Sequence, residues 1–180
     1  MSMLRRQSRP RRVEPLAHNL DPMRFFGADK DAQRVETLKN VPIFHGLSRK
    51  EILEVDELLH ERVYEKEEII FEEGDPGHGI FIVLSGKVRA DPSHELLKTA
   101  NLEFGPGELV GELSLFDEIP RTATVVAVEH TVAVALFQAE FFSLLTKNKR
   151  IGVKVLLEIA RTLSRRARQL LLDQKHVPSL

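Results

Sequence analysis

A carboxylate and a guanidinium lie at the two ends of a ten-residue stretch in which most of the other residues are apolar or small. The segment reads GELSLFDEIPRTATV from Gly111 onward, with Glu112 near its start and Arg121 directly after a proline. If the residues after Glu112 form a short helical turn, the free amides near Gly111 and Ser114 can bind an anion, which the glycine allows to come close. Arg121 could hold the same anion with both arms of its guanidinium. These residues predict a phosphate site.

Glu112 adds a second requirement, because a carboxylate repels a phosphate and needs a hydrogen-bond donor elsewhere on the ligand. A ribose 2′-hydroxyl is such a donor, and a 3′,5′-cyclic nucleotide places it beside a single negative phosphodiester. Thr122 offers a hydroxyl and Ala123 an amide next to Arg121. The combination favours a cyclic nucleotide over a simple anion.

The same residues resemble a known motif. Gly111-Glu112-Leu113-Ser114-Leu115, five further positions, and then Arg121-Thr122-Ala123 are similar to the phosphate-binding cassette of the cyclic-nucleotide-binding domain family. This family includes the catabolite activator protein, the regulatory subunits of protein kinase A and the cyclic-nucleotide-gated channels. The similarity extends over about residues 40–175. We use the name cassette for residues 111–123.

The resemblance implies a role for each matched position. Glu112 would accept a hydrogen bond from the 2′-hydroxyl and Arg121 would hold the cyclic phosphate. The other implied ligand contacts are Gly111, Leu113, Ser114, Thr122 and Ala123, with Val88 and Val110 lining the base pocket and Arg161, Thr162 and Arg165 as candidates for a lid over the base.

Two further expectations follow from the resemblance. We expect cyclic AMP as the ligand on family frequency, with cyclic GMP as the alternative, because a threonine such as Thr122 resembles cyclic-GMP-selective members. The chain departs from the family pattern where Glu67 replaces a frequent glycine before Glu68-Ile69, so that turn could differ.

Short β-type runs separated by turn signals must position these residues. Gly-rich or Pro-containing turns at 74–79, 85–86 and 105–107 lie between apolar runs, and this spacing is typical of a barrel or jelly roll. The expected strands are Val63-Tyr64, Ile69–Phe71, Ile80–Leu84, Lys87–Ala90, one or two within Leu96–Phe104, Thr122–Val128 and Thr131–Phe137. With the family resemblance, the expected class is α+β and mainly β: an eight-stranded β-roll with N-terminal helices and a long C-terminal helix.

Helical patterns flank these runs. We expect helices over Asp31–Lys39, over Ser48–His60 with a Ser48/Glu51 capping box, over Gln138–Leu145 and over Asn148–Gln174. Apolar residues of the last helix recur at alternating intervals of three and four: Val153, Leu156, Ala160, Leu163, Ala167 and Leu170. This seam predicts a homodimer through the C-terminal helix, while other apolar residues pack on the chain's own roll.

Composition limits the remaining possibilities. The chain has 180 residues, no cysteine and a net charge of −1, so disulfides, thiolate metal sites and binding of nucleic acid by overall charge are disfavoured. No apolar run is long enough to cross a bilayer, and we expect a cytoplasmic protein. We divide the chain into a basic arm (1–30, with Ser8 as a weak kinase motif), the β-roll with its helices (31–146) and a lid or dimerisation helix with tail (147–180).

The expected function is that of a non-enzymatic sensor that signals to another protein. Because the chain stops at Leu180, we expect no DNA-binding helix-turn-helix. One alternative is an interaction module of the same fold that has lost its ligand. Another is a cupin-type enzyme, which the spacing of the seven histidines disfavours, and we expect neither catalytic nor metal-binding residues.

Overall fold

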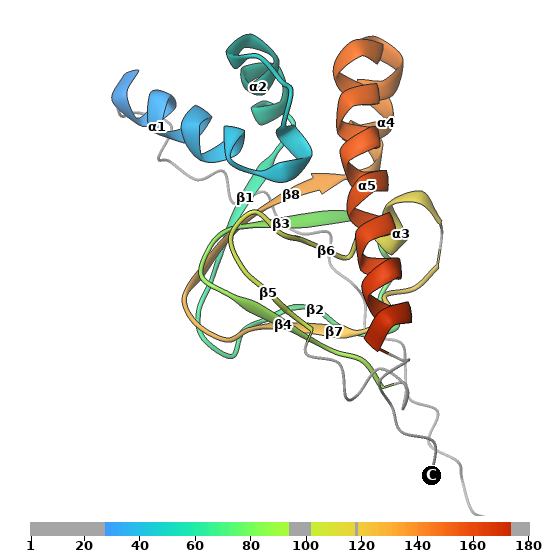
Figure 1. The fold of residues 1–180 in the computed structure, drawn as a ribbon. Helices are drawn as coiled ribbons and strands as arrows, with labels where there is room; N and C mark the ends of the chain where they lie inside the picture. The colour runs from blue at the N-terminus through green and yellow to red at the C-terminus, as the bar shows by residue number, and fades with distance from the viewer. Residues whose placement is uncertain (1–27, 94–101, 118, 174–180) are drawn as a thin grey trace, which may run out of the picture.

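A computed structural model describes residues 28–93, 102–117 and 119–173 of the chain (Figure 1). Eight strands form two antiparallel four-stranded sheets. The strands are β1 (His60–Tyr64), β2 (Ile69–Phe71), β3 (Gly79–Ser85), β4 (Val88–Asp91), β5 (Glu103–Phe104), β6 (Leu109–Val110), β7 (Thr124–Ala127) and β8 (Thr131–Phe137). One sheet has the order β1-β8-β3-β6 and the other β2-β7-β4-β5, so the two sheets pack as a β-roll.

Helices lie at one end and one side of the roll (Figure 1). They are α1 (Ala28–Lys39), the 3₁₀ turn η1 (Pro42–Phe44), α2 (Arg49–Asp56), α3 (Leu113–Phe116), α4 (Gln138–Lys147) and α5 (Lys149–Asp173). This arrangement confirms the predicted fold class: a mainly β roll with N-terminal helices and a long C-terminal helix.

The two larger of three apolar clusters among the described residues hold most of these elements together. The larger one joins the helices to the first sheet, and α5 contributes Ile151, Val155 and Ile159 to it. The smaller one lies between the sheets and contains Val83, Val88, Val110 and Val125. Ile151, Val155 and Ile159 recur at helical spacing, so one face of the first half of α5 is fixed against the roll.

Most elements lie where the sequence placed them. The capping box is present, because the Glu51 amide donates to Ser48 Oγ at 3.3 Å and the Ser48 amide donates to the Glu51 carboxylate at 2.7 Å. The helix that follows is shorter than expected, since Glu57 is its C-cap and His60 already pairs with Ala135 as the first residue of β1. Strand β6 was not predicted, because two residues are too short to show a period.

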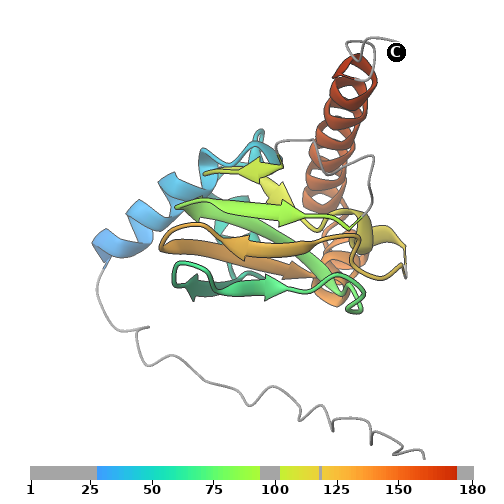
Figure 2. The same cartoon turned by 90° about the horizontal axis from the view of Figure 1, so that it is seen from below.

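The predicted seam of α5 is only partly available. Leu156 and Leu163 pack on the core of the roll. Positions spaced by four and three residues remain as a stripe that we call the α5 seam: Val153, Leu157, Ala160, Ser164, Ala167 and Leu171. All six of these residues are exposed. In Figure 2 the second half of α5 projects beyond the roll, so this stripe is accessible along much of its length.

Glu67 stands where members of the family often have a glycine, and its backbone adopts a conformation that glycine favours. Its φ is 68°, in the left-handed region where glycine is favoured, and it is the one non-glycine residue there in the described part of the chain. The Glu67 amide donates to the Ala127 carbonyl at 2.7 Å, and the Ala127 amide donates to the Glu68 carbonyl at 2.9 Å. These two bonds to β7 hold the strained turn in place.

Candidate functional site

The backbone of the cassette leaves β6 through a glycine that no other residue could replace without movement. Gly111 has a φ of +78°, and a Cβ added there would lie 2.3 Å from Nη1 of Arg121. The same Nη1 donates a hydrogen bond to the Gly111 carbonyl at 2.9 Å. The glycine therefore lets the arginine fold back across the start of the cassette.

Arg121 is buried although it carries a charge, with 6% of its surface exposed. Its guanidinium carbon lies 4.1 Å from the ring centre of Phe71 and 5.9 Å from that of Phe81. Burial lowers the pKa of Arg121, while the nearby carboxylates of Asp75 and Glu112 act in the opposite direction. Nε has no hydrogen-bond partner among the described residues. A buried guanidinium with an unused donor is suited to binding an anion.

The loop between β2 and β3 fixes the position of Arg121. The Arg121 amide donates to the Asp75 carbonyl at 2.8 Å, and the Gly74 amide donates to the Arg121 carbonyl at 2.9 Å. Gly77 of this loop lies against the buried Ser114 of α3, where an added Cβ would lie 2.0 Å from the Ser114 Cβ. Both ends of the cassette are thus packed against one loop.

Glu112 is buried to a similar degree, with 8% of its surface exposed, and it is not paired with Arg121. Its partner is Arg166 of α5, whose Nη1 donates to Glu112 Oε1 at 2.5 Å. Nη2 of Arg166 donates to the Leu109 carbonyl at 2.6 Å, and its guanidinium carbon lies 4.8 Å from the ring centre of Phe104. A surface ion pair between Glu112 and Arg121 is therefore not what this segment forms.

The remaining predicted residues divide into two groups. Val88 and Val110 are buried together in the smaller apolar cluster, which also receives Phe71 and Phe81 beside Arg121. Thr122 is exposed and Ala123 half-buried, and Leu113 exposes 48% of its surface at the first turn of α3.

The structure places the three predicted lid residues away from the buried pair of charges. Arg161 is exposed and pairs with Glu158 of its own helix, and Arg165 donates to the Thr162 hydroxyl at 3.1 Å. Arg166, the next residue along, is the one that contacts the cassette. Because neighbouring helical residues point about 100° apart, an error of one position changes which side chain faces the roll.

Sequence reasoning missed five contributors to this region. They are Phe71, Phe81, Gly77, Phe104 and Arg166. Arg166 could have been identified from the helical period, since it lies on the face that carries Ile159, seven positions earlier. The three phenylalanines and the glycine depend on contacts between segments distant in sequence, for which a single sequence carries no local signal.

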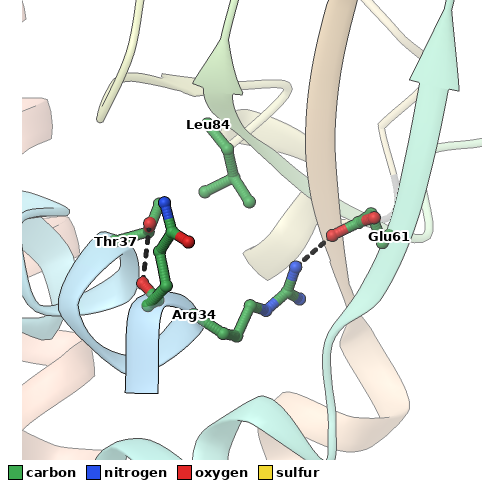
Figure 3. A pocket seen from close by; sticks show the side chains of 5 residues that line it. Arg34, Thr37, Glu61 and Leu84 are labelled. Carbon is green, nitrogen blue, oxygen red and sulfur yellow. Dashed lines mark hydrogen bonds and ion pairs between the residues drawn. The ribbon is translucent and has the colours of Figure 1, made fainter. Parts of the chain in front are cut away.

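A shallow hollow lies elsewhere on the molecule, between α1 and strands β1 and β3 (Figure 3). It measures about 350 Å³ and is lined by Gln33, Arg34, Thr37, Glu61 and Leu84. Arg34 is already paired there with Asp56 and Glu61. Since its one cation is satisfied by carboxylates, we do not assign a ligand to this hollow.

Two other features were sought in the described part of the chain. Among those residues, no group of three or more histidine, cysteine, aspartate or glutamate side chains could hold a metal ion. None of the described helices is both long enough and apolar enough to span a bilayer.

Comparison with known proteins agrees with this geometry. The profile of the family "Cyclic nucleotide-binding domain" matches residues 61–148. The cyclic AMP receptor protein of Thermus thermophilus is 38% identical over 127 residues, which cover 70% of this chain and 59% of that protein. The chain thus spans about three fifths of the length of this curated relative.

Two solved structures extend the match. A cyclic nucleotide-binding domain from Methylobacillus flagellatus superposes with a TM-score of 0.70 at 25% identity, covering 86% of this chain and 89% of that one. The N-terminal domain of a transcriptional regulator from Streptomyces coelicolor superposes with a TM-score of 0.59 at 30% identity, covering 72% and 94%. The fold, the cassette and these similarities agree, and the chain belongs to the cyclic nucleotide-binding domain family.

Proposed function

We propose that this protein is a non-enzymatic sensor that binds 3′,5′-cyclic AMP, or alternatively cyclic GMP, in the cassette. The observation that carries the proposal is the buried Arg121 guanidinium, which has an unused Nε donor and lies beside the Gly111 turn. The similar protein from Thermus thermophilus is a cyclic AMP receptor, which supports cyclic AMP as the first ligand to test.

The charges of the site suit a ligand that is a monoanion with one free hydroxyl. Arg121 would bind the cyclic phosphate, and the Arg166 pair leaves Oε2 of Glu112 to accept from the ribose 2′-hydroxyl. The charge of Arg166 offsets that of Glu112, which leaves Arg121 to face the single negative charge of the phosphodiester. Val88 and Val110 would contact the apolar face of the base.

Arg166 supplies a route from the site to α5. Its contacts with Glu112 and the Leu109 carbonyl tie the projecting half of the helix to the cassette. A ligand that binds Glu112 would change the strength of this tie, and it would shift α5 only if it bound the two positions of the helix with different affinity. We propose that α5 carries the signal to a partner protein.

The α5 seam is our proposed surface for a homodimer. Its four–three spacing is that of a two-stranded coiled coil, and Ala160, Ser164 and Ala167 would let the two helices approach closely. Because Leu156 and Leu163 pack on the roll, the seam shares three of its six positions with the predicted one and lies one residue further along at the other three.

Calorimetric titration of the purified protein with cyclic AMP and cyclic GMP tests the ligand. Arg121→Ala should weaken binding by about 2–5 kcal/mol, the range for removing one side of a buried charge pair. Arg121→Lys should restore only part of it, because lysine cannot donate two parallel bonds. The exposed Arg62→Ala on β1 is the control. Unchanged affinity in Arg121→Ala would remove the assignment.

The role of Glu112 can be tested with a ligand that lacks the hydroxyl. Replacing cyclic AMP with 2′-deoxy cyclic AMP should weaken binding to the unaltered protein, whereas Glu112→Gln should bind the two ligands with more nearly equal affinity. An equal loss in both proteins would show that the 2′-hydroxyl does not contact Glu112.

The second candidate is an interaction module that has lost its ligand. The pairing of Glu112 with Arg166 favours it to a degree, because one carboxylate oxygen is already occupied by the protein itself. Absence of heat with both cyclic nucleotides, in a protein that still forms the dimer, would support this candidate over the sensor.

A further inference from the structure

The projecting half of α5 carries a row of arginines beside the seam. Arg161, Arg165 and Arg168 are exposed and follow one another at four and three residues, so they lie on one face over about 10 Å. Neither Arg165 nor Arg168 is paired with a carboxylate among the residues that the structure describes, and Arg165 contacts only the Thr162 hydroxyl. We call these three residues the arginine stripe.

A surface of the opposite charge lies on strands β1 and β2 and the turn between them. Five exposed glutamates outnumber the two exposed cations of this stretch, Arg62 and Lys66: Glu65, Glu67 and Glu68 lie in the turn, and Glu72 and Glu73 follow β2 directly. Two apolar side chains are exposed among them, Val63 at 53% and Ile69 at 47%. We call this surface the acidic edge, since β1 and β2 are each the outer strand of a sheet.

The two surfaces lie too far apart to meet within one molecule. Through Arg166, α5 contacts Leu109 of β6 and the ring of Phe104 in β5, which are the outer strands at the other edges of the two sheets. Figure 2 shows the same separation, with α5 projecting on one side of the roll and β1 and β2 on the other. Although the net charge is only −1, the molecule therefore has a basic side and an acidic side.

We propose that the arginine stripe of one copy binds the acidic edge of a second copy. Exposed ion pairs each contribute up to about 1 kcal/mol, so three of them give a weak, salt-sensitive contact. Val63 and Ile69 on the acidic edge add apolar area to it.

The geometry of this contact differs from that of the proposed dimer. The contact joins two different surfaces, so it is head-to-tail and can extend from copy to copy, whereas the seam is self-complementary. It does not require a nucleotide, and it leaves the α5 seam free for pairing. The acidic edge also discourages strand pairing between copies, which is compatible with a role as a charged docking surface.

Sedimentation equilibrium of the full chain tests the proposal. The average mass should exceed that of the dimer at about 20 mM salt and fall toward it at about 500 mM, where charges are screened within a few ångströms. Arg165→Glu/Arg168→Glu and Glu67→Lys/Glu72→Lys should each abolish the excess mass. Arg49→Glu/Lys50→Glu on α2 changes the net charge by the same amount as the arginine variant, at exposed residues away from both surfaces, and should retain the excess mass.

Charge reversal then identifies the partner surface. An equimolar mixture of the two reversed variants should associate again, because the acidic stripe of one meets the basic edge of the other. The chain that carries all four changes should also regain its excess mass. The proposal is overturned by a mass that does not respond to salt, by an unaltered mass in either reversed variant, or by a mixture that does not associate.

Discussion

The contact of Arg166 with the cassette leads to a quantitative prediction about the pair it forms with Glu112. The two side chains retain only 25% and 10% of their exposure, so the pair is largely shielded from solvent. Arg166→Ala removes one bond to a carboxylate and one to the Leu109 carbonyl, and it leaves Glu112 buried without that partner.

The magnitude follows from the kind of bond that is lost. A hydrogen bond that involves a charged group contributes about 1.5–3 kcal/mol, and the contact with Phe104 adds about 0.5–1 kcal/mol. Only the bond to Glu112 belongs to the coupling between the two side chains. We therefore expect a coupling free energy of about 1.5–3 kcal/mol between positions 112 and 166.

A double-mutant cycle measures this coupling. Urea unfolding of the unaltered protein, Glu112→Gln, Arg166→Ala and the double variant gives the coupling free energy, while hydrogen exchange locates the effect in α5. Protection should fall at amides after Leu163, where the helix no longer packs on the core. Arg165→Ala is the matched control, because its side chain contacts no carboxylate in the described structure. A coupling below about 0.3 kcal/mol, within the additivity of independent sites, would refute the pair.

Three further predictions concern the stability of the roll. Gly77→Ala should lower the free energy of unfolding by about 1–3 kcal/mol, because the added methyl overlaps Ser114, and calorimetry should show weaker binding of cyclic AMP. Glu67→Gly should raise the free energy of unfolding by up to about 1 kcal/mol in urea, since left-handed strain of about 1–2 kcal/mol is relieved and part of it is offset by backbone entropy. The capping hydrogen bond from Ser48 and the cation of Lys154 lower the pKa of Glu51 to about 2. The stabilising effect of the Glu51 carboxylate should therefore be full above about pH 4.5 and be lost as the pH falls toward 2. Urea unfolding of the protein and of Glu51→Gln from about pH 6 to about pH 3 measures this loss.

Each of these outcomes can fail in an identifiable way. An unfolding free energy and affinity unchanged in Gly77→Ala would show that the β2–β3 loop does not press on α3. A loss of stability in Glu67→Gly would mean that the glutamate side chain contributes more than its backbone costs. A difference between the protein and Glu51→Gln that stays constant, or widens, toward pH 3 would contradict the depressed pKa of Glu51.

Most of the fold could be predicted from local sequence patterns. The Ser48 cap, the run of glycine turns and the short apolar run from Thr131 to Phe137 each act over a few residues, so each could be identified without tertiary contacts. Strand β6 could not, because its two residues are ordered by pairing with Phe81 and Ile82 of β3. The early end of α2 has the same cause, since pairing of His60 with β8 overrides the helical period.

The residues of the candidate site can also be divided into those with a local sequence signal and those that depend on tertiary contacts. Glu112 and Arg121 could be identified because both lie within one short segment of the sequence. The structure buries both side chains. The environment of Arg121 comes from Phe71 and Phe81, whose closeness to it depends on how two sheets fold over each other. Arg166 was missed for a different reason: Ile151, Val155 and Ile159 mark the face of α5 that packs on the roll, and the helical period was not followed along that face as far as Arg166.

The ring of Phe104, which stacks on Arg166, offers a site for a fluorescent probe of the position of α5. The chain contains no tryptophan, so an indole in place of Phe104 would be the sole source of tryptophan emission. Indole attracts a guanidinium more strongly than a benzene ring does, so the variant should preserve the stacked arrangement. Its fluorescence would then change when the helix leaves the roll, so the rate of that movement after mixing with a nucleotide could be measured in stopped flow.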